Sequence, residues 1–225
     1  MHSLGLLRLL QLASPSLPVG AYTYSQGLEW AVEAGVIYDG KSAFAWIEAI
    51  LLNSIATFDA PLLAAALKAW QNNEADRIND LNKEYLAARE SAELRAETIQ
   101  MGFSLRSLAE QFQRSKMTSQ ILIAIQDISF PIAWAALACA WHIDELSAVQ
   151  GYLWNHCESQ VAAAVKLVPL GQSTGQQLLF ELAAPIPLLS EKALHTPREL
   201  WCTFSPGLAI SSCSHETQYT RLFRC

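Results

Sequence analysis

The chain has 225 residues, of which 52% are hydrophobic and only 16% are charged, and its formal net charge is −6. This apolar content excludes an intrinsically disordered chain, and the length suits one domain with a large core. The sequence has no run of basic residues, which excludes a nucleic-acid partner that needs clustered Lys and Arg. Because about a quarter of residues are charged in a typical soluble domain, either partners cover much of the surface or the chain contacts a membrane.

The first part of the chain reads as a leucine-rich helix that ends in a loop. Residues 14–20 have the sequence SPSLPVG, and prolines in such a loop resist helix formation. Residues 22–30 follow, with a dense mixture of aromatic and polar side chains. At this junction Tyr24 is either an interface contact or a core residue at a helix start, and Glu29 suits the first turn of a helix.

The middle of the chain is helical by periodicity and composition. Apolar side chains repeat every three or four residues, which places them on one helix face: Phe44, Ile47, Leu51, Ile55 and Phe58. Residues 60–183 are rich in Ala, Leu, Glu and Gln, which favour helices, and no convincing alternating strand is present. The sequence therefore predicts an all-α fold.

Proline and aspartate residues mark the expected helix boundaries. Pro61 allows a helix to begin or kink near Asp59, and Asp144 can cap the helix that runs towards Lys166. Pro169 is expected to end that helix, and residues 185–187 (PIP) are expected to close the helical region.

Residues 121–140 are the one stretch that resembles a membrane span. Asp127 near its middle is costly in a bilayer, and Pro131 interrupts the pattern. We therefore expect two core helices separated by a turn, and no membrane insertion.

The residues that follow the PIP stretch differ from the rest. They contain Pro197, Pro206 and a serine-rich stretch before the ending QYTRLFRC. Such a segment is expected to be an extended tail that a partner orders. The predicted organisation is a helical domain over residues 1–190 and a partner-binding C-terminal segment over residues 191–225.

Chemistry-bearing motifs are absent from the sequence. The five histidines are scattered through different segments, no cysteine pair is spaced as CxxC, and residues 171–176 lack the Lys of a phosphate-binding loop. His215 and Cys225 in the tail are the more interesting candidates for a soft metal, but they form no cluster. We therefore predict no catalytic, cofactor or metal site, and the cysteine pattern with the lack of a signal peptide favours a cytoplasmic protein.

Charged residues gather on one helix in residues 89–97. Arg89 and Glu93 form an opposite-charge pair at i,i+4, whereas Glu93 and Glu97 form a like-charge pair. Two interpretations stay open: a solvated helix face, or an interface in which arginines make planar contacts with a partner.

Four segments together resemble the UreF family of urease accessory proteins. Residues 9–29 read LLQLASPSLPVGAYTYSQGLE, residues 88–95 and 100–102 read ARESAELR and QMG, residues 168–176 read VPLGQSTGQ, and residues 215–224 read HETQYTRLFR. They occur in the family's order, and the first and fourth together are specific. Cys225 departs from the family, which commonly ends in serine.

The resemblance implies an all-helical bundle of about ten helices with an extended C-terminal tail. It implies a homodimer that binds the accessory protein UreD/UreH, recruits the GTPase UreG and meets apo-urease for nickel insertion. Such a scaffold is not an enzyme and needs no cofactor. The alternatives are a helical nickel-binding carrier or another cytosolic helical binding protein.

The residues expected to bind partners lie near the N-terminal junction, on one helix and in the tail. We expect Arg221 and Arg224 to make charge-assisted contacts and Leu222 and Phe223 to fill pockets of UreD/UreH. The GTPase is expected to face Glu29 and Lys166. The full predicted set is Tyr24, Glu29, Lys166, His215, Glu216, Tyr219, Arg221, Leu222, Phe223 and Arg224.

Overall fold

The computed structural model describes residues 3–112 and 116–224, and all of its regular elements in these ranges are helical. The first half contains α1 (Ser3–Leu12), η1 (Ala21–Thr23), α2 (Leu28–Glu33), α3 (Gly40–Ile50), η2 (Leu51–Asp59), α4 (Ala60–Gln71), α5 (Ala75–Ala87) and α6 (Ala92–Phe112). The second half contains α7 (Lys116–Ala124), α8 (Phe130–Ala140), α9 (Glu145–Leu167), α10 (Gln172–Ala183), α11 (Ile186–His195), η3 (Arg198–Leu200) and α12 (Pro206–His215). The expected all-α fold is confirmed.

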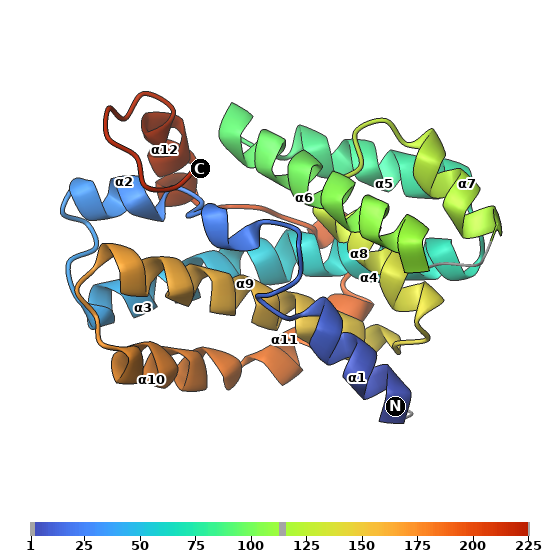
Figure 1. Cartoon of the computed structure of the whole chain (residues 1–225), viewed down its shortest axis with the longest axis horizontal. Helices are drawn as coiled ribbons and strands as arrows, with labels where there is room; N and C mark the ends of the chain where they lie inside the picture. Colours follow the sequence, from blue (N-terminus) through green and yellow to red (C-terminus); the bar gives the residue numbers. More distant parts are fainter. Residues whose placement is uncertain (1–2, 113–115, 225) are drawn as a thin grey trace.

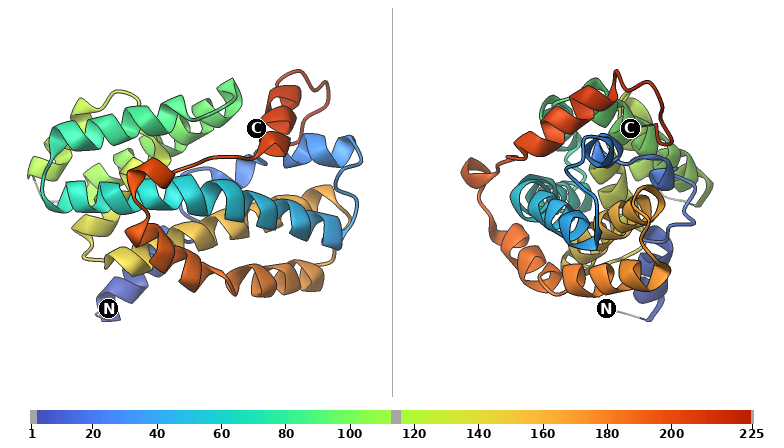
Figure 2. Two further views of the ribbon diagram at one scale, coloured as in Figure 1. Left: turned by 180° about the vertical axis from the view of Figure 1, so that it is seen from behind. Right: turned by 90° about the vertical axis from the view of Figure 1, so that its left-hand side faces the viewer.

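Helices α4, α8 and α9 form the centre of the molecule. α8 packs against α4 and α6, while α9 packs against α10 and α11 on the opposite side (Figures 1 and 2). α12 lies beside α2 at one end of the molecule. A long connecting segment, residues 196–205, leads from α11 to α12, and the C-terminus lies at the same end. α2 and the C-terminal segment, which are far apart in sequence, are thereby brought together.

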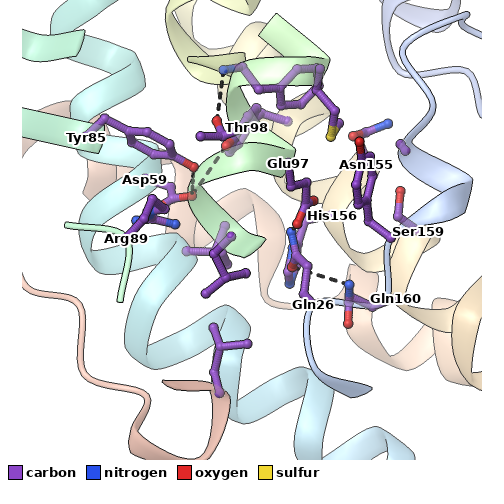
Figure 3. A pocket seen from close by; sticks show the side chains of 18 residues that line it. Gln26, Asp59, Tyr85, Arg89, Glu97, Thr98, Asn155, His156, Ser159 and Gln160 are labelled. Carbon is purple, nitrogen blue, oxygen red and sulfur yellow. Dashed lines mark hydrogen bonds and ion pairs between the residues drawn. The ribbon is translucent and has the colours of Figure 1, made fainter. Parts of the chain in front are cut away.

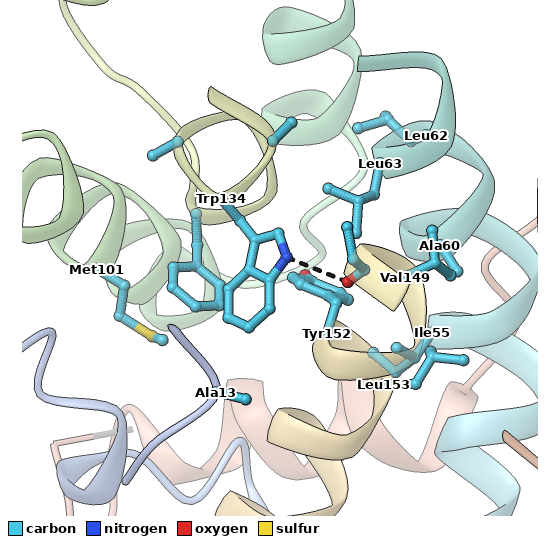
Figure 4. Packing of buried hydrophobic residues seen from close by; sticks show 14 of the residues in the cluster. Ala13, Ile55, Ala60, Leu62, Leu63, Met101, Trp134, Val149, Tyr152 and Leu153 are labelled. Carbon is cyan, nitrogen blue, oxygen red and sulfur yellow. Dashed lines mark hydrogen bonds between the residues drawn. The ribbon is translucent and has the colours of Figure 1, made fainter. Parts of the chain in front are cut away.

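The core is built around α8, whose residues from Phe130 to Ala138 are all buried. Trp134 is fully buried, and its ring packs edge-on against Tyr152 with the centroids 5.6 Å apart (Figure 4). The indole Nε1 donates a hydrogen bond to the carbonyl oxygen of Ala148 at 3.2 Å, which satisfies the only polar atom of that side chain. Alanines on α8 let the neighbouring helices approach closely.

The membrane-like stretch is two helices, as expected. α7 ends at Ala124 and α8 begins at Phe130, so Asp127 and its neighbours lie in the turn between them. A different segment, Gly40–Gln71, is long and apolar enough to span a bilayer, but 78% of its most apolar window is buried inside the protein. It is therefore explained as a core helix.

Within this long helix, η2 is a π-helical segment that ends two residues before Pro61. The predicted helix stripe is confirmed, since Ile47, Leu51, Ile55 and Phe58 are buried. Pro61 has no N–H for the carbonyl of Thr57 four residues back, and the amide of Cys202 donates to that carbonyl at 3.1 Å instead. The segment that connects α11 to α12 is thus attached to the long helix at η2.

The expected end of the helical region at residues 185–187 is wrong. Pro185 precedes α11 and Pro187 lies in its first turn, where a missing N–H costs nothing because that N–H has no partner within the helix. Pro206 opens α12 in the same way, so the tail is partly helical rather than extended. α11 also crosses residue 190, the expected domain boundary.

Two other boundaries are confirmed. The side chain of Asp144 accepts a hydrogen bond from the backbone N–H of Ser147 at 2.9 Å and caps α9. α9 ends at Leu167, two residues before Pro169.

Candidate partner-binding site

Glu29 lies at the point where the tail meets the body of the protein. It occupies the first turn of α2, and only 7% of its surface is exposed. Its Oε1 accepts the backbone N–H of Leu222 at 2.6 Å, and its Oε2 accepts the backbone N–H of Phe223 at 2.9 Å. One carboxylate thereby fixes two successive residues of the tail by charge-assisted hydrogen bonds.

His215, at the end of α12, is fully buried between two carboxylates. Its Nε2 lies 3.2 Å from Glu29 Oε2, and its Nδ1 lies 2.7 Å from Glu93 Oε2. Each ring nitrogen thus lies within hydrogen-bond distance of a carboxylate oxygen. Arg221 adds a cation to this cluster, with Nη1 2.8 Å from Glu93 Oε1. We call Glu29, Glu93, His215, Arg221 and Phe223 the tail anchor.

Close approach of α12 to α2 depends on Gly27. Its φ of +78° lies in the left-handed region, and a Cβ there would lie 2.8 Å from the backbone nitrogen of Ser212. Glycine is therefore required both by the conformation and by the contact.

Further contacts fasten the tail on either side of the anchor. Glu216 Oε1 accepts the N–H of Ala92 at 2.9 Å, at the N-terminus of α6 where a negative charge suits the helix dipole. The backbone N–H of Arg224 donates to Thr23 O at 2.9 Å. Lys166 Nζ lies 5.5 Å from the centre of the Phe223 ring, within cation–π range.

The predicted residues divide into buried and exposed groups. Tyr24 and Phe223 are buried, with 7% and 6% exposed, so they are core residues in this chain. Tyr219 is fully exposed and Leu222 is 68% exposed. The structure thus brings Glu29, the tail and Lys166 together, but it turns only part of the tail outward.

The role of Glu93 was not predicted from the sequence. Its spacing gave an opposite-charge pair with Arg89 and a like-charge pair with Glu97, on a helix face expected to be either solvated or part of an interface. In the folded chain Glu93 faces His215 and Arg221, while Glu97 accepts a hydrogen bond from Gln26 Nε2 at 2.9 Å. Both carboxylates therefore have partners inside the chain, and the like-charge spacing was the available signal.

A polar cavity of ≈ 60 Å³ lies beneath this region (Figure 3). On one side Asp59 accepts hydrogen bonds from Tyr85 at 2.8 Å and from Arg89 at 3.1 Å. Burial raises the pKa of Tyr85 well above its usual value. Burial alone would lower the pKa of the Arg89 guanidinium, but Asp59 and the neighbouring Tyr85, Tyr152 and Glu90 together raise it above its usual value, so Arg89 stays charged. Arg89 is thus an interior residue, so for this residue both a solvated face and a contact with a partner are wrong.

The other side of the cavity carries amide and imidazole groups. Gln26, at a positive φ of 52°, bridges Glu97 and Gln160, whose Nε2 donates to Gln26 Oε1 at 3.3 Å. Burial lowers the pKa of His156 to about 4, so its imidazole is neutral near pH 7. These groups come from α6, α9 and the loop before α2, and no short motif in the sequence unites them.

A metal centre finds no support in the described part of the chain. Within residues 3–112 and 116–224, no three His, Cys, Asp or Glu side chains are grouped so that they could hold a metal ion. The expected candidate Cys225 lies outside the described residues.

Comparison with known proteins identifies the family. The UreF family model matches residues 37–183. The chain is 52% identical over 223 residues to a urease accessory protein UreF of Dechloromonas aromatica (strain RCB), with 98% of both chains covered. It is 54% identical over 224 residues to a urease accessory protein UreF of Azoarcus sp. (strain BH72), covering 98% of this chain and 96% of the relative. The chain therefore belongs to the UreF family of urease accessory proteins, and it is an accessory protein rather than an enzyme.

Proposed function

We propose that this protein is a scaffold that joins UreD/UreH to the GTPase UreG and presents both to apo-urease for nickel insertion. We further propose that it acts as a homodimer in the cytoplasm. Family membership supports an assembly role, and the arrangement of the tail supports a specific docking surface.

The observation that carries the proposal is that the tail has a fixed backbone but exposed side chains. The tail anchor fixes the backbone of residues 221–223 while Tyr219, Leu222 and Arg224 remain exposed. An aromatic, an aliphatic and an arginine side chain on a fixed backbone form the kind of cluster that carries binding energy in protein interfaces. Because the backbone is already ordered, binding requires less loss of conformational entropy.

This arrangement changes the roles proposed for individual residues. Leu222 is available to fill a pocket of UreD/UreH, whereas Phe223 holds the tail by packing inside this chain. Arg221 holds the tail by its ion pair with Glu93, whereas Arg224 remains available for a carboxylate of a partner. Lys166, which is exposed beside Tyr22, is the proposed contact to the GTPase, and Glu29 acts by positioning the tail.

The experiment is coexpression with the genomic UreD/UreH and UreG, followed by size-exclusion chromatography with light scattering. The double variant Tyr219→Ala/Leu222→Ala is expected to lose UreD/UreH while remaining folded, and truncation after Ser214 is expected to do the same. The matched control is Phe180→Ala/Leu188→Ala, which removes two equally exposed side chains (82% and 71%) from α10 and α11, away from the tail (Figure 1). Retention of UreD/UreH by both tail variants would refute the docking surface.

A further inference from the structure

One side of the polar cavity is bounded by α12. Its walls come from η2, α5, α6 and α9, and Leu208 of α12 lines it together with Gln26 from the loop that α12 covers. Leu208 itself is only 5% exposed. On this side the cavity is therefore bounded by α12 and by the loop beneath it.

The cavity favours water over empty space. His156 Nε2 and Gln160 Oε1 are buried and have no hydrogen-bond partner among the described residues. A buried polar atom without a partner is costly, and a cavity of ≈ 60 Å³ has room for about four water molecules. Water in the cavity can therefore exchange with bulk solvent whenever the cavity opens.

α12 is attached mainly by polar contacts. Its buried residues are Leu208, Ser211, Ser212 and His215, so Leu208 is the only large apolar side chain that it buries. Ser212 Oγ lies 2.5 Å from Ser91 Oγ at the start of α6, and His215 joins the tail anchor. Phe223 is the second large apolar side chain that residues 206–224 bury, and a segment that buries so little apolar surface can open at a lower free energy than the whole domain.

We propose that α12 and the tail, residues 206–224, form a lid that opens as a unit over the polar cavity, with Glu29, His215 and Glu93 as its latch. The lid connects the docking surface of the tail to the interior of the protein. This property belongs to the isolated chain, so it stands or falls separately from the proposed partners.

His156 is a native reporter of lid opening. Diethyl pyrocarbonate modifies the unprotonated imidazole nitrogen, and His156 is neutral near pH 7 but buried, whereas His142 and His195 are exposed. Peptide mass spectrometry resolves the modification of each residue on the full-length protein. We expect slow labelling of His156 relative to the two exposed histidines in the wild type.

Glu29→Gln tests the latch. The amide cannot supply the charge that holds two backbone N–H groups and His215, so labelling of His156 is expected to rise by about tenfold or more. Glu181→Gln is the matched control, because this exposed glutamate on α10 accepts a hydrogen bond from Gln177 Nε2 at 3.4 Å and lies outside the latch, so it should leave the rate unchanged. An unchanged His156 rate in Glu29→Gln would overturn the proposal.

Global unfolding is distinguished by Cys157, which is fully buried in the core and does not line the cavity. If the lid opens alone, His156 labelling rises in Glu29→Gln while reaction of the Cys157 thiol with a maleimide stays slow. A parallel rise of both reactions would show that the whole domain opens and would refute a separate lid.

A reversible cross-link gives the converse test. Ser91→Cys/Ser212→Cys replaces two hydroxyls already in contact, in a background in which Cys202, Cys213 and Cys225 are changed to Ser. The oxidised form is expected to suppress His156 labelling at least about tenfold, and reduction is expected to restore it. Equal labelling in the oxidised and reduced forms would overturn the lid.

Discussion

Gly102→Ala is expected to destabilise the protein although it improves helix propensity. Gly102 is in the middle of α6, where alanine alone would add about 1 kcal/mol of stability. The added Cβ, however, would lie 2.1 Å from the carbonyl oxygen of Ile128 and 2.8 Å from the carbonyl carbon of Ser129. These are backbone atoms in the turn before α8, so they cannot move aside as a flexible side chain would.

The contact between the added Cβ and the turn decides whether Gly102→Ala stabilises or destabilises the protein. Overpacking typically costs 1–3 kcal/mol, and a clash of more than about 1 Å with backbone belongs at the upper end of that range. The net loss is therefore about 2 kcal/mol, which corresponds to a fall in Tm of about 4–8 °C for a domain of this size.

The assay is thermal unfolding followed by circular dichroism. Gly171→Ala is the matched control, because Gly171 has an ordinary φ of −71° and no atom within 4 Å of the added Cβ. A change in its Tm of less than about 2 °C is expected. If Gly102→Ala proved as stable as the wild type, α6 would not pack against the turn before α8 as closely as the structure places it.

The remaining predictions concern buried charge, pH and capping. Asp59→Asn leaves Arg89 buried without its carboxylate and should cost about 3–5 kcal/mol in urea unfolding, whereas Glu84→Gln, which breaks the exposed pair with Arg198, should cost less than about 1 kcal/mol. Because burial lowers the pKa of His156 from 6.5 to about 4, the stability contributed by the neutral imidazole is complete above pH 6.5 and is lost as the pH falls towards 4. His156→Gln should therefore show a smaller decrease in unfolding free energy than the wild type between these two pH values, and an equal decrease would contradict the assignment. Asp144→Ala should cost about 1 kcal/mol by removing the cap of α9, and a change in urea midpoint near zero would count against that cap.

Local sequence patterns predicted most helices, because the formation and the ends of a helix depend on residues that are close in sequence. The apolar stripe of η2, the cap at Asp144 and the break before Pro169 all follow from spacing or from backbone chemistry within a few residues. Proline was interpreted wrongly at residues 185–187 because the same residue that interrupts a helix also suits its first turn. Sequence alone does not say on which side of the proline the helix lies.

The candidate site was predicted only in part because it joins segments far apart in sequence. The resemblance pointed to Glu29 and the tail, but it did not show that Glu29 accepts the amides of Leu222 and Phe223, almost 200 residues away. Nor did it show that Phe223 turns inward while Leu222 turns outward. Such assignments depend on packing of α12 against α2, which no local pattern contains.

α6 contacts both the tail, through Glu93, and the edge of the cavity, through Glu97. Glu93 and Glu97 are one helical turn apart, and their mutual repulsion would weaken an isolated helix. In the folded chain Glu93 is compensated by Arg221 and His215 of the tail, whereas Glu97 accepts from Gln26 at the edge of the cavity. Removal of the tail would leave Glu93 with neither partner, so the start of α6 would lose favourable charge contacts as α12 left. The like-charge pair therefore favours attachment of the tail, because the tail supplies the groups that face Glu93.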